Sequence, residues 1–122
     1  MRVLHNRLRQ QRWELDERRR FLAGLETLAS RLRRDAQRLH WEIEEEQGAG
    51  ALERKPGVSY PIFLEPLLDR RKQLERSIAE IDAQITEARE AVATAEQEVG
   101  VHEAAWANRV KVNGIAVRRV RR

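Results

Sequence analysis

Residues 15–43 read LDERRRFLAGLETLASRLRRDAQRLHWEI, and apolar side chains return in this stretch at alternating spacings of four and three residues. The same spacing extends outward from Leu4 to Ile43 and fills six heptads. Its a positions are Leu8, Leu15, Leu22, Ala29, Ala36 and Ile43, and its d positions are Leu4, Gln11, Arg18, Leu25, Leu32 and Leu39. A repeat of this length predicts a long helix with one apolar stripe for a partner helix.

A second run with the same spacing covers residues 67–106. It comprises Leu67, Arg71, Leu74, Ile78, Ile81, Ile85, Ala88, Val92, Ala95, Val99, His102 and Trp106. Helix breakers separate the two runs, at Gly48 and Gly50 and again at Pro56, Gly57 and Pro61. We therefore expect a helix over about 2–47, a turn over about 48–60, a helix over about 61–113 and a basic tail at 114–122. Pro66 predicts that the second helix either starts at Glu65 or bends there.

The two runs fit each other in antiparallel register. Positions whose numbers sum to 110 pair every a residue with a d residue, as in Leu15 with Ala95 and Leu25 with Ile85. Small residues face large ones in most of these layers, which keeps the layer volume nearly constant. The sequence thus predicts an all-α fold, a long antiparallel two-helix coiled-coil hairpin that forms a single domain over 1–122. A parallel dimer is the alternative, but it would stack Ala29 and Ala36 on themselves and leave gaps.

Composition and charge agree with long solvated helices. The chain has 122 residues, of which 36% are charged, and a mean hydropathy of −0.72, and it contains no cysteine and no membrane-length apolar run. We expect a cytoplasmic protein without thiol chemistry. Residues 1–40 hold 11 basic and 5 acidic side chains, residues 41–100 hold 7 and 14, and residues 101–122 hold 6 and 1. A two-helix hairpin has no third layer, so we expect it to be marginally stable alone and to gain order by docking.

The residues that carry chemistry do not form a catalytic pattern. Ser30, Ser59 and Ser77 lack a nucleophile-elbow context, and there is no phosphate-binding Gly-Lys-Ser/Thr motif. A metal site between His5 and His102 is conceivable, but histidines beside the seam are the simpler interpretation. We expect no enzymatic activity, no cofactor and no metal.

Surface aromatic residues suggest a binding protein instead. The heptad frame places Trp13 and Trp41 at f positions, on the outer face of the first helix, and an exposed tryptophan is a candidate for an interface. Tyr60, Phe63 and Leu67 belong to the one concentrated apolar cluster, which lies at the bend. A basic nucleic-acid-binding protein is a further alternative, given the isoelectric point near 10.3. Because acidic residues interleave with the basic ones along both helices, we expect no nucleic acid partner.

Several segments resemble the FliJ family of flagellar type III export proteins. They are Leu15-Asp16-Glu17-Arg18-Arg19-Arg20, Leu39-His40-Trp41-Glu42-Ile43, Tyr60-Pro61-Ile62-Phe63, Arg70-Arg71-Lys72-Gln73-Leu74 and Ile78-Ala79-Glu80-Ile81. The similarity covers about residues 8–106, and its most specific part is the Tyr-Pro-x-Phe turn followed by the Arg-Arg step. The sequence departs from the family pattern at Pro66 and in its short basic end.

The resemblance implies a non-enzymatic stalk in the cytoplasm, peripheral to the inner membrane at the flagellar base through protein contacts. Its partners would be the hexameric export ATPase, the membrane export gate protein and export chaperones. The open end of the hairpin would enter the ATPase ring through Arg7, Arg9, Arg12, Arg109 and Arg118, because both basic termini meet there. Trp41, Tyr60, Phe63 and Leu67 would contact the export gate or a chaperone. The equivalent stalk of an injectisome and a generic dimeric coiled-coil scaffold fit the same residues.

Overall fold

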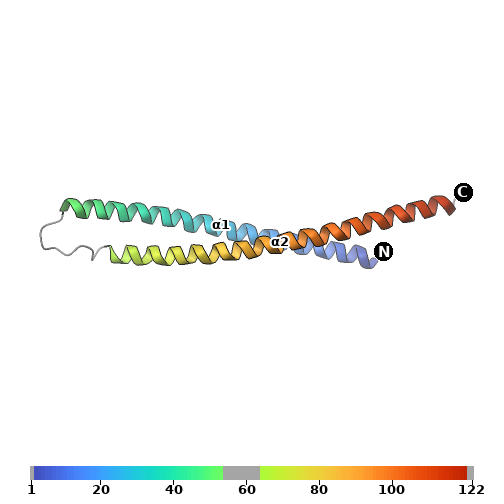
Figure 1. The fold of residues 1–122 in the computed structure, drawn as a ribbon, viewed down its shortest axis with the longest axis horizontal. Helices are drawn as coiled ribbons and strands as arrows, with labels where there is room; N and C mark the ends of the chain where they lie inside the picture. The colour runs from blue at the N-terminus through green and yellow to red at the C-terminus, as the bar shows by residue number, and fades with distance from the viewer. Residues whose placement is uncertain (1, 54–63, 121–122) are drawn as a thin grey trace. The chain divides into compact units, whose positions relative to one another are not determined.

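Two long helices make up the computed structural model, which describes residues 2–53 and 64–120 and the side chains of 2–48 and 64–114. Helix α1 spans Arg2–Glu53 and helix α2 spans Glu65–Val120, and the described residues contain no strand (Figure 1). The two helices pack against each other with opposite chain directions, so the predicted all-α two-helix hairpin is confirmed. Contacts divide it into two units, residues 24–85 and residues 1–23 with 86–122.

Both helices are longer than the sequence breakers predict. Helix α1 continues through Gly48 to Glu53, and α2 continues through Gly114 to Val120, so the predicted ends at 47 and 113 are wrong. Neither Gly48 nor Gly114 adopts the left-handed φ with which glycine ends a helix. A glycine that keeps helical φ weakens a helix by only about 1 kcal/mol and does not stop it.

Helix α2 begins where Pro66 allows. Leu64 precedes the helix and its carbonyl oxygen accepts the first helical hydrogen bond, from the Leu68 amide at 2.9 Å. Pro66 is then the second residue of α2, and residues in the first turn donate no amide hydrogen bond within the helix. The start at Glu65 is one of the two alternatives that the sequence left open, and it corrects the earlier start near residue 61.

The unit formed by residues 24–85 has an apolar core on the predicted seam. Leu39, Ile43 and Leu64 are buried together, and Leu67, Leu68 and Leu74 pack against them. Leu25, Ala29, Ile81 and Ile85 are also buried in this unit.

The unit formed by residues 1–23 and 86–122 has a second core, in which Leu8, Leu15, Ala95 and Val99 are buried and Val92 and Trp106 pack against them. Arg18 lies on this seam and is half-buried. Its Nη1 donates to the Ala91 carbonyl oxygen at 3.1 Å. The guanidinium thus satisfies its hydrogen bonding on the neighbouring helix without a carboxylate.

Burial follows the heptad almost without exception. Every a and d residue from Leu4 to Ile43 and from Leu67 to Trp106 is buried or half-buried, apart from Arg71. The Arg71 side chain is exposed and its Nε lies 3.9 Å from Glu75 Oε1 on the same helix. The heptad assignment is therefore confirmed in both helices.

An intramolecular disulfide tests the antiparallel register in solution. Leu15 and Ala95 lie in one buried cluster, so we expect the double variant Leu15→Cys, Ala95→Cys to oxidise within the monomer at low concentration. Non-reducing gel electrophoresis after oxidation reports the product. The matched control pairs Ala95→Cys with Trp13→Cys, because Trp13 is 64% exposed on the outer face of α1. Dimers as the main product of the first variant would contradict the hairpin and favour a parallel dimer.

Candidate partner-binding surfaces

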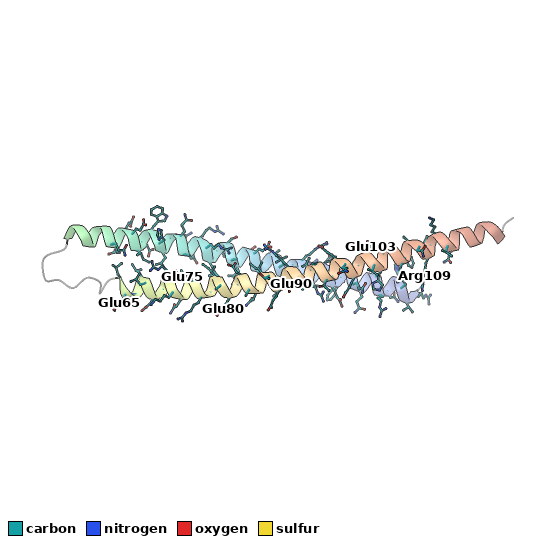
Figure 2. The ribbon with its side chains drawn as sticks, viewed as in Figure 1. Glu65, Glu75, Glu80, Glu90, Glu103 and Arg109 are labelled. Carbon is teal, nitrogen blue, oxygen red and sulfur yellow. The ribbon has the colours of Figure 1, made fainter. Side chains whose placement is uncertain are left out.

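Ion pairs between the helices line one flank of the seam in each unit. Arg12 Nη2 lies 3.0 Å from Glu103 Oε1, and Arg19 Nη2 lies 3.2 Å from Glu96 Oε1. In the other unit Arg33 Nη2 lies 2.7 Å from Asp82 Oδ1. Each pair has residue numbers that sum to 115, so all three join e positions of the two helices. Figure 2 labels Glu103 on α2.

These ion pairs favour one register of the two helices, but they add little to the free energy of unfolding. Their side chains are about half exposed, and exposed ion pairs contribute only about 0–1 kcal/mol each. A register shift of one heptad would instead place like charges opposite each other at some of these positions, which is unfavourable. The sequence analysis missed the pairs, although the register of 110 already contained them.

The two ends of the chain form a basic surface in the unit of residues 1–23 and 86–122. Residues 1–13 and 104–122 contain no acidic side chain. Arg7, Arg9, Arg109 and Lys111 are all exposed, and none of them pairs with a carboxylate within the described part of the chain. Contact between the rings of His5 and Trp106, with centroids 5.4 Å apart, holds the two helices together here. We call the four cationic residues the basic end; Figure 2 labels Arg109 beyond Glu103 along α2.

Two of the predicted seating residues differ from the others. Arg12 donates to Glu103 Oε1 through both Nε and Nη2, at 3.2 and 3.0 Å, so it is paired with a carboxylate of the other helix. Its predicted role in seating the open end stays a prediction. Arg118 belongs to α2, but its side chain lies outside the described residues.

A shallow open groove runs along the ion-paired flank of this unit. It is lined by Arg12, Leu15, Asp16, Arg19, Glu96, Val99, Gly100 and Glu103. Two arginines face three carboxylates here, and both arginines are already paired. The groove therefore has no free cation with which to bind a phosphate or another anion.

The two seam histidines are engaged separately. His5 contacts Trp106, whereas His102 Nδ1 lies 2.9 Å from the Glu98 carbonyl oxygen of its own helix. Among the residues described, no three His, Asp or Glu side chains gather closely enough to hold a metal ion. The geometry gives no support to the metal-site alternative.

Both tryptophans predicted to lie on the outer face are exposed. Trp13 is 64% exposed and Trp41 is 58% exposed, which confirms their f positions. The ring of His40 lies edge-on to Trp41 with centroids 6.0 Å apart, and His40 Nε2 lies 3.0 Å from Glu44 Oε1. Trp41 thus presents most of its ring to solvent, as an interface residue would.

Of the three residues predicted to form a docking cluster at the bend, the structure describes only Leu67. Tyr60 and Phe63 lie outside the described residues. Leu67 is half-buried and packs against the Leu39, Ile43 and Leu64 core. Leu67 therefore lies on the seam at a d position, as the heptad predicts, and its role in binding a partner stays a prediction.

Comparison with known proteins returned no relative: no family model, curated protein or solved structure matches the chain. Within the described residues, neither helix has an apolar stretch long enough to cross a membrane.

Proposed function

We propose that this protein is a non-enzymatic stalk or adaptor of the flagellar type III export apparatus, which inserts its basic end into the hexameric export ATPase. The resemblance to the FliJ family supplies the identity of the partners. In this proposal the protein works in the cytoplasm beside the inner membrane and also contacts the export gate and export chaperones. The equivalent stalk of an injectisome would use the same surfaces.

One observation supports this proposal above the others: unpaired cations from both helices are gathered at the basic end. Arg7 and Arg9 on α1 and Arg109 and Lys111 on α2 are exposed in the same unit. In the register of 110, Arg109 and Lys111 lie beyond the start of α1 at Arg2, so α2 alone forms the tip of this end (Figure 1). Long-range attraction to an acidic or carbonyl-lined cavity would speed and orient the entry of such an end.

Binding by purified components tests the proposal and separates it from its alternatives. We expect the full chain, immobilised as bait, to retain the hexameric export ATPase at physiological salt and to release it as salt is raised. Quantified retention of the ATPase and of duplex DNA, at 0.15 M salt and above, reports the result. Retention of DNA without the ATPase would favour a nucleic-acid-binding protein. Retention of neither, with a dimer in analytical ultracentrifugation, would favour a coiled-coil scaffold.

A further inference from the structure

The seams of the two units differ in how many of their layers contain a polar side chain. In the unit of residues 24–85, every layer of the register of 110 is apolar except the one that contains Arg71, and the Arg71 side chain is exposed. In the unit of residues 1–23 and 86–122, three of the six layers contain a polar residue. These layers pair Gln11 with Val99, Arg18 with Val92 and His102 with Leu8.

Gln11 raises the free energy of the closed seam in this unit. It occupies a d position between Leu8 and Leu15, which are both buried, and its Oε1 atom is buried without a hydrogen-bond partner among the described residues. A buried amide oxygen without a partner has lost the hydrogen bond that water would give it. When the two helices separate, water reaches the Gln11 amide and this cost disappears.

The other contacts of the unit compensate for this cost only weakly. Arg18 and His102 are half-buried, and each directs a nitrogen at a backbone carbonyl oxygen, so neither adds the apolar contact that leucine would make at a d position. The two ion pairs between the helices in this unit join side chains that are about half exposed. Exposed ion pairs add little to the stability of the closed state.

We propose that the two helices separate locally within the unit of residues 1–23 and 86–122 while the unit of residues 24–85 stays paired, and that Gln11 sets this difference. Proteins open in cooperative segments, and segments with few buried apolar contacts open most easily. The open state exposes seam residues of both helices, such as Leu15 and Val99. A partner that binds one of these helices alone then meets a smaller free-energy cost. The opening is a property of the free chain, so this proposal can fail independently of ATPase seating.

Hydrogen exchange of the full chain without any partner, measured residue by residue by NMR, tests the proposal. Amides of residues 8–22 and 88–102 should have protection factors at least about tenfold lower than amides of residues 25–43 and 67–85, because local opening exposes only the first group. Protection factors should also be similar throughout the first group. Fraying from the chain ends would instead give protection that rises steadily from Leu8 to Leu22.

Three single variants assign the difference to the buried amide. Gln11→Leu should raise the protection factors of the first group at least about tenfold and leave the second group unchanged, because leucine suits a d position. Gln10→Leu is the matched control, since it makes the same change at the neighbouring exposed position, and it should alter both groups by less than about twofold. Leu32→Gln places an amide at a d position of the other unit, and it should lower protection there at least about tenfold.

Two outcomes would overturn the proposal. Equal protection in the two groups, raised equally by Gln11→Leu, would show that the hairpin opens only as a whole. Protection that rises steadily away from the chain ends, with no change in Gln11→Leu, would show that the ends fray without a cooperative opening set by Gln11.

Discussion

Replacing Ile43 with alanine should lower the free energy of unfolding by about 2–5 kcal/mol, the range for truncating a buried large aliphatic side chain. Ile43 is only 2% exposed, and it packs with Leu39 and Leu64 in the core of the unit of residues 24–85. The loss combines the removed apolar contacts with the cavity that a thin two-helix seam cannot refill from a further layer. Urea denaturation followed by circular dichroism should show a lower midpoint with an unchanged slope.

Two further variants make this measurement decisive. Ile43→Val removes one methylene and should destabilise by about 0.5–1.5 kcal/mol, which remains measurable if the alanine variant is largely unfolded. Trp41→Ala removes a larger side chain from the same helix, but Trp41 is 58% exposed, so we expect a change within about 0.5 kcal/mol. A larger effect at Trp41 than at Ile43 would place the buried face of α1 on the wrong side.

The seam itself could be predicted from the sequence because its signal is repeated over many turns. A polar residue at one d position, such as Gln11 or Arg18, does not change which face of the helix is buried when the other heptads have apolar residues at a and d. The consequence of such a substitution is local: the Gln11 Oε1 atom is buried without a hydrogen-bond partner among the described residues. The heptad periodicity predicts which face of the helix is buried, but it does not predict the hydrogen-bond partner of a polar side chain on that face.

The helix ends could not be predicted, because a breaker residue only lowers the stability of a helix. Gly48 and Gly114 keep helical φ, and the neighbouring turns outweigh their unfavourable propensity. Pro66 constrains the start of α2 more strongly, because the clash of proline with a preceding turn is steric. A glycine disfavours the helix only weakly in comparison, so a glycine near the end of a helix does not determine the residue at which the helix ends.

The candidate surfaces were only partly predictable, for a geometric reason. The exposure of Trp13 and Trp41 follows from the heptad alone, because f positions point away from the partner. The pairing of Arg12 with Glu103 depends on which e position of the other helix lies opposite, and the burial pattern of one helix does not contain that information. Leu67 shows the same difficulty, because an apolar residue near a bend can belong to the seam or to a docking surface.

Reversing three charges at the basic end should abolish most of the proposed interaction with the export ATPase. We expect the triple variant Arg7→Glu, Arg9→Glu, Arg109→Glu to bind the hexamer at least about tenfold more weakly at physiological salt. ATPase stimulation should fall in parallel. All three side chains are exposed and none has a carboxylate partner among the described residues, so the hairpin should keep its helicity. Titration calorimetry and steady-state ATP hydrolysis, repeated as salt is raised, give the two readouts.

The salt dependence distinguishes specific seating from general attraction between a basic rod and an acidic ring. The control reverses Arg31, Arg34 and Arg38, which are exposed on α1 in the unit of residues 24–85 and change the net charge by the same amount. If the basic end enters the ring, the first variant loses stimulation and its affinity falls less steeply with salt, whereas the control retains most of both. Equal losses in the two variants would show that only net charge matters. Full stimulation by the first variant with the wild-type salt slope would falsify insertion through this end, because a cation that seats in the ring cannot be reversed without effect.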